Sequence, residues 1–433
     1  MSNRKTWALL AAVAAVAVGG VARAESVSAA ANPESLSLSR PVALSTGEKR
    51  GLLMQGFDAV GVGKALDDLR INIGGHVAAS VTYYPDPVNG KVQPGRGFDS
   101  ENQDPMLNQV SVFVERMVDA RKGEFDIGGK MEWIYGGDAR FIHSTGLFDH
   151  YGVGNGPDEQ FDLTQLYVDV AVAGVRVRAG KFVTGAGYET INPTTTPFHS
   201  RGLLYTYLLP FTHTGITGEF YVGNWSFELG VIRGWDDALE DKNGGVSFYG
   251  RTVYTYNDGK SEAAATFIAG PEYADNNGDY RYLLDIVYKH KYSDQWTFAI
   301  QGDVLVESDQ DGNGPSSDYG VAFGLAGFAS YEFSQYFTFN GRLEYLYDGS
   351  AFRFNPPVFG DDGFGNIIVL PGTGEPNNIY STALGVTITP FPTDNIGSNL
   401  KIIPEMRYDY AQNAVFGGHN HQLSFALSAY FTF

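Results

Sequence analysis

Along most of the chain, apolar and polar residues alternate with a period of two. In residues 71–83 (INIGGHVAASVTY), isoleucine, valine and alanine alternate with polar or small residues such as Asn72 and His76. Successive side chains of a strand point to opposite faces, so the pattern predicts a β-strand with one face suited to lipid and the other to water. The same pattern returns in residues 108–118 and 124–135.

The alternation continues to the last residue of the chain and predicts about sixteen strands in all. Besides the three segments above, we expect strands over residues 161–172, 175–184, 211–222, 225–235, 246–256, 261–271, 280–292, 296–307, 319–333, 336–348, 378–390, 399–410 and 421–433. An even number of strands lets both termini of the chain lie on the periplasmic side of the membrane.

The connections between these strands alternate between short and long. The short ones are residues 173–174, 223–224, 257–260, 293–295 and 334–335, and the long ones, rich in Gly, Asp, Asn and Pro, are 85–105, 136–160, 185–210, 308–318 and 349–377. A soluble β-sandwich gives no reason for this alternation. The sequence therefore predicts an all-β protein, a transmembrane antiparallel up-and-down β-barrel with short periplasmic turns and long extracellular loops.

The first residues indicate export. Arg4 and Lys5 precede an apolar run from Trp7 to Val18, and Ala22-Arg23-Ala24 offers a small-x-small cleavage site, so residues 1–24 are predicted to be a signal peptide. An uncleaved anchor would need about 20 apolar residues. No later stretch approaches the length of a membrane-spanning helix.

The predicted barrel occupies residues 71–433 and follows two other segments. Residues 25–50 are rich in Ser and Ala without an apolar period, which predicts a flexible periplasmic leader. Residues 51–70 space their apolar positions partly as a helix does, and we expect a short amphipathic segment under or inside the barrel.

Composition agrees with a membrane barrel and excludes other classes. Cysteine is absent, so disulfides, thiolate metal sites and cysteine nucleophiles are excluded. Aromatic residues make up 14% of the chain, which the girdles of a membrane barrel would use, although a soluble β-sandwich could show the same bias. The formal charge of -19 argues against a nucleic-acid partner, because phosphate recognition needs clustered Lys and Arg.

The last predicted strand, residues 422–433, sets Leu423, Phe425 and Leu427 on one face and ends in Phe433. Outer-membrane barrels generally end in such a strand with a terminal aromatic residue. The resemblance implies recognition by the barrel-assembly machinery and insertion among the lipids of a Gram-negative outer membrane. An ordinary closing strand that ends in Phe remains the alternative.

Several short motifs stand out along the chain: Gly51–Met54, Gly61–Lys64, Asp162–Val168, Ala179–Phe182, Gly187–Glu189, His213–Gly215 and Gly270–Glu272. In their order and spacing they resemble the family called putative beta-barrel porin-2, or OmpL-like. Where the family leads us to expect Ser-Arg-Ser, this chain has Ser200-Arg201-Gly202. The resemblance implies a porin-like barrel and names no solute.

If the chain is a porin, the inward face of the strands decides what passes, and the alternation assigns charges of both signs to it. The predicted pore-lining residues are Glu115, Lys130, Glu132, Asp169, Arg176, Arg178, Glu219, Glu228, Asp285, Lys289, Asp303, Glu307, Arg342, Glu344, Glu405, Arg407 and Asp409.

Two short turns set the register of these charges. A two-residue turn at 173–174 places Asp169 opposite Arg178, as a cross-strand ion pair or as structural scaffolding. The turn at 223–224 places Glu219 opposite Glu228, so we expect a cation from Arg176 or Arg178 beside them.

Residues 185–210 are the candidate constriction loop, because this long segment carries Tyr188, Glu189, His199 and Arg201 between two strands. A sixteen-strand barrel without such a loop would be a wide aqueous channel. An exposed surface loop is the alternative.

Three patterns suggest other chemistry, each weakly. Asp309, Asp311 and Asn313 begin like a calcium loop, but Gly320 stands where a bidentate Glu belongs. The pair His419 and His421 lacks further ligands for a metal. Asp149-His150 and Asp361-Asp362 resemble the acidic and His-Asp groups of outer-membrane proteases, without any sign that they converge. We therefore expect no enzyme activity, no bound metal and no cofactor.

The sequence thus favours a porin that lets small hydrophilic solutes or ions diffuse through a charged aqueous lumen. The alternative is a plugged structural, adhesion or binding barrel that uses its long extracellular loops, especially residues 349–377. Many large porins form trimers, so a homotrimer stays open.

Overall fold

The computed structural model describes residues 50–87, 93–152, 156–308, 319–349, 353, 358–361, 367–370 and 375–433. Its strands are β1 Ile71–Tyr83, β2 Met106–Arg116, β3 Asp126–Gly136, β4 Gln160–Val172, β5 Val175–Val183, β6 Thr212–Val222, β7 Trp225–Ile232, β8 Ser247–Tyr256, β9 Ser261–Tyr273, β10 Asn276–Lys291, β11 Trp296–Ser308, β12 Tyr319–Ser334, β13 Phe337–Asp348, β14 Val358–Asp361, β15 Ile367–Leu370, β16 Asn377–Ile388, β17 Leu400–Ala411 and β18 His421–Thr432. Its helices are α2 Leu52–Ala59, α3 Gly63–Asp68 and α4 Leu203–Tyr207, with short 3₁₀ turns η1 Ala120–Lys122, η2 Gly137–Phe141 and η3 Gly397–Asn399.

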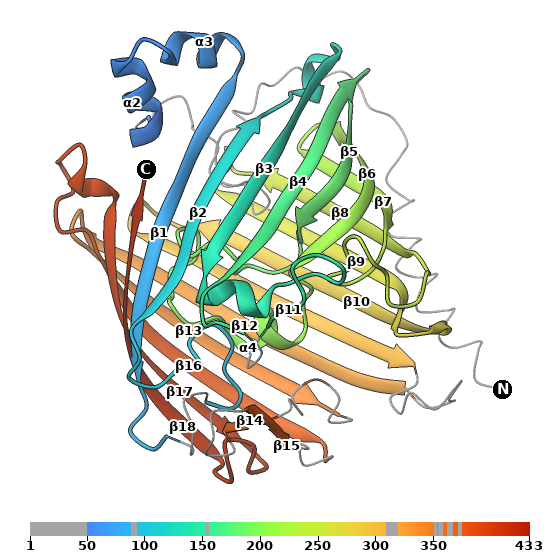
Figure 1. Ribbon diagram of the computed structural model, residues 1–433, viewed down its shortest axis with the longest axis vertical. Helices are drawn as coiled ribbons and strands as arrows, with labels where there is room; N and C mark the ends of the chain where they lie inside the picture. Colours follow the sequence, from blue (N-terminus) through green and yellow to red (C-terminus); the bar gives the residue numbers. More distant parts are fainter. Residues whose placement is uncertain are drawn as a thin grey trace. The chain divides into compact units, whose positions relative to one another are not determined.

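The strands close into one barrel (Figure 1). Each strand pairs antiparallel with its neighbour in the sequence, and β1 pairs with β18 to complete the circle. Among the described strands, β14 and β15 alone stand apart, as a two-stranded sheet in the connection between β13 and β16. The predicted sixteen-strand antiparallel up-and-down barrel is confirmed. No described helix is long and apolar enough to cross a membrane.

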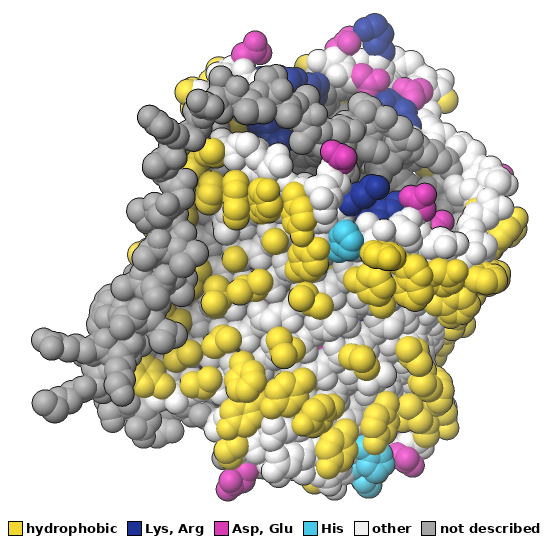
Figure 2. Space-filling model, turned by 180° about the vertical axis from the view of Figure 1, so that it is seen from behind, with side chains coloured by type: hydrophobic (Ala, Val, Ile, Leu, Met, Phe, Trp, Pro, Cys, Tyr) yellow, Lys and Arg dark blue, Asp and Glu magenta, His cyan; other side chains and the backbone are white. Residues whose placement is uncertain are grey.

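The period of two in the sequence separates an apolar outer wall from a polar interior. On β13, Phe339 and Leu343 are 47% and 64% exposed, whereas the intervening Arg342 is buried. Figure 2 shows hydrophobic side chains spread over the outer wall, with charged side chains gathered above and below them. A lipid-facing wall needs such a surface, because side chains in contact with hydrocarbon must be apolar and every backbone polar group must be hydrogen-bonded within the barrel.

Aromatic side chains form contacts near both ends of the wall. At the end with the short turns, Trp225 lies 4.5 Å from Tyr254, and Trp296 lies 4.6 Å from Tyr331, measured between ring centroids. At the other end, Tyr345 lies 5.2 Å from Tyr380. Amphipathic rings at two levels are typical of the girdles that hold a barrel at the two membrane interfaces.

The closing seam involves the terminal residue. The backbone N–H of Phe433 donates to Gly75 O at 2.9 Å, and Gly75 N–H donates to Phe433 O at 3.1 Å. Helix α2 lies beside β1 at this end of the barrel (Figure 1), and the Gln55 side chain accepts a hydrogen bond from Asn395 in the β16–β17 connection. Residues 51–70 therefore form two short helices against the seam.

Strand boundaries agree with the sequence-based expectation to within four residues, the largest shift being β10, which begins at Asn276 where residue 280 is expected. The β14–β15 hairpin and helix α4 are not predicted. The expected signal peptide (1–24), nearly all of the leader (25–50) and the calcium-like residues 309–314 lie outside the described residues.

The protease-like groups can be followed only in part. Asp149 accepts the backbone N–H of Gly146 at 2.7 Å, a turn-stabilising contact, and Asp361 ends β14, while Asp362 lies outside the described residues. The rings of His419 and His421 are 6.3 Å apart. Within the described part of the chain, no cluster of three or more His, Cys, Asp or Glu side chains could hold a metal ion.

Candidate functional site: the charged lumen and its crossing segment

Residues 184–211, which we call the β5–β6 segment, cross the lumen. The backbone of this segment is hydrogen-bonded to strands around the barrel: Gly185 O accepts from Arg251 on β8 at 3.0 Å, and Tyr188 N–H donates to Gln301 on β11 at 3.0 Å. Ile191 O accepts from Gln109 on β2 at 2.9 Å. Because β2 and β11 are on different sides of the barrel, only a segment inside it can reach both.

Arg342 on β13 is the main anchor of the β5–β6 segment. Its guanidinium donates to Glu189 Oε1 at 2.7 Å, to Ser200 O at 2.9 Å and to Ser200 Oγ at 2.9 Å. It also lies 3.0 Å from Glu344 on its own strand and 4.9 Å from the centre of the Phe198 ring. The side chain is fully buried. Charge-assisted bonds of this kind are the strong ones, so the segment is held firmly.

A second anchor lies on β17. Glu405 accepts the backbone N–H of His199 at 2.7 Å and the hydroxyl of Ser200. Arg407 donates to Arg201 O at 2.6 Å, and its Nε lies 2.9 Å from Asp409 Oδ1. The turn at residues 199–201 is therefore fixed by one strand carboxylate, Glu405, and two strand guanidinium groups, those of Arg342 and Arg407.

Two nearby carboxylates explain why the third position of Ser200-Arg201-Gly202 is glycine in this chain. A Cβ atom at residue 202 would lie 2.2 Å from Glu344 Oε1 and 2.7 Å from Glu189 Oε2. The Gly202 N–H donates to Glu189 Oε2 at 2.7 Å, a hydrogen bond that the close approach of the backbone to Glu189 makes possible. A serine here would displace the carboxylates that Arg342 binds.

The connection between β1 and β2 also enters the barrel, which the sequence did not indicate. Arg96 donates to Gln422 on β18 at 2.9 Å and lies 2.8 Å from both Asp99 and Asp409. Phe98 packs against Tyr205 of α4, with ring centroids 6.0 Å apart. The predicted surface loop 85–105 thus places at least residues 96–99 against the interior wall.

One apolar cluster joins these segments to the barrel wall. It is formed by side chains near the strand ends that carry the longer connections, together with the β5–β6 segment; its members include Ile134, Phe182, Phe198, Leu203, Leu204, Tyr205, Ile268, Leu305, Leu346 and Ile379. The cluster is buried and reaches strands on opposite walls. It fills space in this half of the lumen that would be open in an empty sixteen-strand barrel.

In the other half of the lumen, towards the short turns, the charged side chains are more exposed. Here Asp169 stands opposite Arg178, as the turn at 173–174 predicts, with 2.9 Å between Oδ1 and Nε. Glu219 stands opposite Glu228, and Arg176 lies 2.5 Å from Glu219. The Arg176 and Arg178 side chains keep 21% and 14% exposure, against 0% for Arg342.

Several of the remaining predicted charges are ion-paired, and others contact neutral groups. Lys130 lies 2.8 Å from Glu132 on the same strand, and Glu115 accepts from Asn72 at 3.1 Å. Glu307 pairs with Arg281 on β10. Lys289 lies 5.8 Å from the centre of the Tyr188 ring, so it faces the start of the β5–β6 segment. Most interior carboxylates thus have a cation as a close neighbour.

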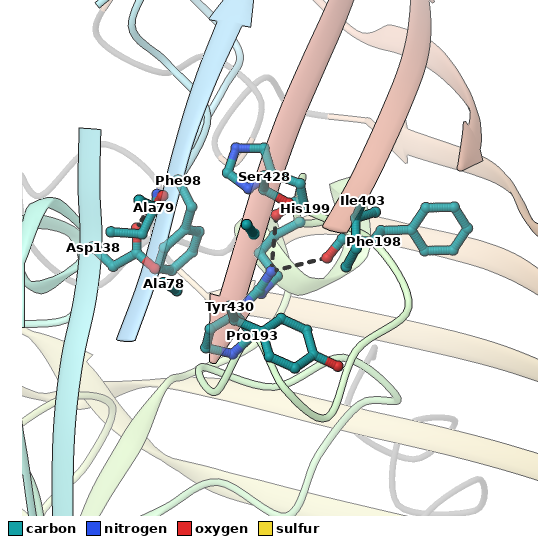
Figure 3. A pocket seen from close by; sticks show the side chains of 13 residues that line it. Ala78, Ala79, Phe98, Asp138, Pro193, Phe198, His199, Ile403, Ser428 and Tyr430 are labelled. Atoms are coloured by element: carbon teal, nitrogen blue, oxygen red, sulfur yellow. Dashed lines mark hydrogen bonds between the residues drawn. The ribbon is translucent and has the colours of Figure 1, made fainter. Parts of the chain in front are cut away.

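A small cavity of about 20 Å³ lies where the β5–β6 segment meets β1 and β18, with room for about one water molecule (Figure 3). His199, Arg201 and Asp138 of η2 line it. Burial raises the pKa of the Asp138 carboxyl, because desolvation outweighs the nearby Arg201 and the hydrogen bonds from Asn108 and Gln109. The cavity is too small for an organic solute.

The closed barrel, its apolar outer wall and its charged interior define a channel-forming β-barrel protein of the Gram-negative outer membrane. The chain belongs to the family described as Putative beta-barrel porin-2, OmpL-like, whose model matches residues 70–433. No curated protein matches the sequence.

Solved outer-membrane proteins share the fold at low sequence identity. OmpT of Vibrio cholerae matches with a TM-score of 0.52 and 10% identity, over 84% of this chain and 97% of that one; OmpT is also matched in a trimer form. The anion-selective porin of Comamonas acidovorans matches with 0.52 and 10%, over 84% and 99%. The outer membrane channel DcaP of Acinetobacter baumannii matches with 0.51 and 13%, over 84% and 97%.

Proposed function

We propose that this protein lets small hydrophilic solutes and ions diffuse passively through its lumen, and that the β5–β6 segment sets the narrowest point. The observation that carries the proposal is the crossing segment, anchored by Arg342 and Glu405 inside a barrel with a charged wall. Tyr188, Glu189, His199 and Arg201 would form the constriction. No reaction step, metal or cofactor is needed for this role.

The charges that β4 to β7 place in the half towards the short turns favour cations. Asp169, Glu219 and Glu228 supply three carboxylates there, against the two guanidinium groups of Arg176 and Arg178. A lining of one net sign concentrates counter-ions. We therefore infer a modest preference for cations. The long connections would face the cell exterior, and the barrel would contact lipid and, during insertion, the assembly machinery.

Replacing Arg176 and Arg178 by alanine removes two positive charges from this half and should increase cation selectivity. In planar bilayers under a KCl gradient, we expect the K⁺/Cl⁻ permeability ratio from the reversal potential to rise by up to about tenfold, the low end of what a charged lining achieves. Asp294→Asn, on an exposed turn, is the control. An unchanged ratio in the double variant would show that these side chains do not line the ion path.

The apolar cluster supports a second candidate, a barrel plugged by its own segments that acts through its outer connections. Such a barrel gives no current steps in the same bilayers, while a partner still binds outside. For the assembly, we propose a homotrimer, by analogy with the trimer form of OmpT. Light scattering of the detergent-solubilised protein would give its mass.

A further inference from the structure

Asp285 on β10 and Asp303 on β11 differ from the ion-paired carboxylates described above. They are direct cross-strand partners, both face inward, and they are 0% and 1% exposed. Paired side chains of this kind have Cβ atoms about 4.5–5.5 Å apart, so the two carboxyl groups can touch.

Neither carboxyl is neutralised by a hydrogen-bonded cation. Among the described residues, no Lys or Arg side chain donates a hydrogen bond to Asp285 or Asp303, and the donors beside Asp285 are the neutral Gly187 N–H and Thr266 hydroxyl. Asp303 Oδ2 accepts from Gln301 at 2.8 Å. Elsewhere in the lumen, Asp169, Glu189 and Glu219 each have a guanidinium within 2.9 Å. Two adjacent buried carboxylates cannot both be charged without such a partner, whereas one shared proton satisfies both.

We propose that Asp285 and Asp303 form a proton-binding site, in which one proton bonded to Asp303 Oδ1 is shared with Asp285, and that its occupancy controls the docking of the β5–β6 segment. This inference builds on the proposed channel function. The link to the segment is Gln301, which donates to Asp303 and accepts the backbone N–H of Tyr188. The carboxyl pair and the first turn of the segment therefore share one hydrogen-bonded chain.

The groups that face the pair leave this assignment intact. Arg251 comes from β8 and donates through Nε to Gly185 O; its charge acts on Asp285 from nearby, without a hydrogen bond to either carboxyl. Thr266 from β9 is neutral, and Glu344 from β13 adds a further negative charge near Asp303. Lys289, four residues beyond Asp285 on β10, lies over the Tyr188 ring.

The sign of the effect follows from the charge. While the pair holds its proton, it carries one negative charge and Gln301 keeps its place. When the pH rises and the proton leaves, two negative charges stand side by side in a buried site, and they can be relieved only by water. Water enters if residues 185–188 lift from the wall. Docking is therefore complete at lower pH and is lost as the pH rises.

Infrared spectroscopy of the reconstituted barrel tests the site without any need for conduction. In the difference spectrum of wild type minus Asp303→Asn at neutral pH, we expect one protonated-carboxyl C=O band, which shifts in D₂O and disappears on titration to alkaline pH. Asp285→Asn should also remove or move the band. Asp294→Asn, on the exposed turn of the same hairpin, should leave it in place.

Bilayer conductance then tests the link to the segment. The conductance of the wild type should increase over the same pH range in which the infrared band disappears. Asp303→Asn keeps the shape of the side chain but cannot ionise, so its conductance should not depend on pH in this range. Absence of the band from the difference spectrum, or a loss of thermal stability on adding EDTA, which indicates a bound metal ion, would overturn the proton site. A band without pH-dependent conductance would overturn the control of docking. A barrel that never conducts still shows the band, so failure of the channel proposal is recognised separately.

Discussion

Replacing residues 189–207 by a glycine–serine linker just long enough to join residues 188 and 208 should raise single-channel conductance about twofold or more. The deleted residues supply the Glu189, His199 and Arg201 contacts with the wall and a large share of the apolar cluster. Without them, the lumen approaches the open aqueous channel of a sixteen-strand barrel.

The barrel should survive this replacement. Its strands are held by continuous ladders that close on themselves, and the interior charges released by the deletion become hydrated. The matched control replaces residues 239–245, a connection at the same end of the barrel, by a similar linker and should leave conductance unchanged. Equal conductance for the wild type and the 189–207 replacement would mean that the β5–β6 segment does not restrict the passage.

Arg342→Met should release the β5–β6 segment while leaving it in the chain. Methionine fills part of the volume but leaves Glu189 and Glu344 buried without their cation. Removing one partner of a buried ion pair costs about 3–5 kcal/mol, and here the cost falls on the docked state of the segment. Since each 1.4 kcal/mol is a factor of ten, undocking should become on the order of a hundredfold more frequent, or more.

Hydrogen exchange reads this change directly. The Gly202 N–H, bonded to Glu189, and the Ser200 N–H, bonded to Glu405, should exchange faster by that factor, while amides of the barrel ladder keep their protection. Arg176→Met removes a guanidinium that contacts the wall only and is the control. Unchanged exchange at residues 199–204 in Arg342→Met would refute the role of Arg342 as anchor.

The barrel could be predicted from the sequence because its rule is local. A strand that faces lipid on one side and water on the other must alternate, so the register of Asp169 with Arg178 and of Glu219 with Glu228 follows from the alternation and the length of the turn. The position of Arg176 beside Glu219 follows from the same count.

What lies inside the barrel could not be predicted in the same way. The partners of Arg342 are 142 and 153 residues away along the chain, and no periodic pattern connects them. The inward position of Arg96 is equally non-local, because its partners Asp409 and Gln422 are on the last two strands. The one local sign was Gly202, a departure from the expected serine whose reason appears only beside Glu189 and Glu344.

For Asp285 and Asp303, the position of each residue could be predicted from the sequence but its charge partners could not. The alternation placed both on the inward face, and the length of the β10–β11 turn could have placed them opposite each other. They lack the hydrogen-bonded cation that serves Asp169 or Glu219, and Arg251, the guanidinium near Asp285, donates through Nε to Gly185 O of the crossing segment. Charge pairing in the lumen is therefore decided by the crossing segment as well as by the strands.

The central claim is that the β5–β6 segment is held inside the barrel, and a cysteine pair tests it most directly. The natural chain has no cysteine, so Leu204→Cys with Gly324→Cys introduces the only two. A Cβ atom at Gly324 would lie 2.9 Å from Leu204 Cγ, which puts the two Cβ atoms within about 4.4 Å, inside the range that a disulfide spans. Gly327, where an added Cβ meets no neighbour, gives the control pair with Leu204→Cys. We predict an intramolecular disulfide in the folded barrel for the 204–324 pair and none for the 204–327 pair. Free thiols in the first pair under oxidising conditions would contradict the placement of the segment in the lumen.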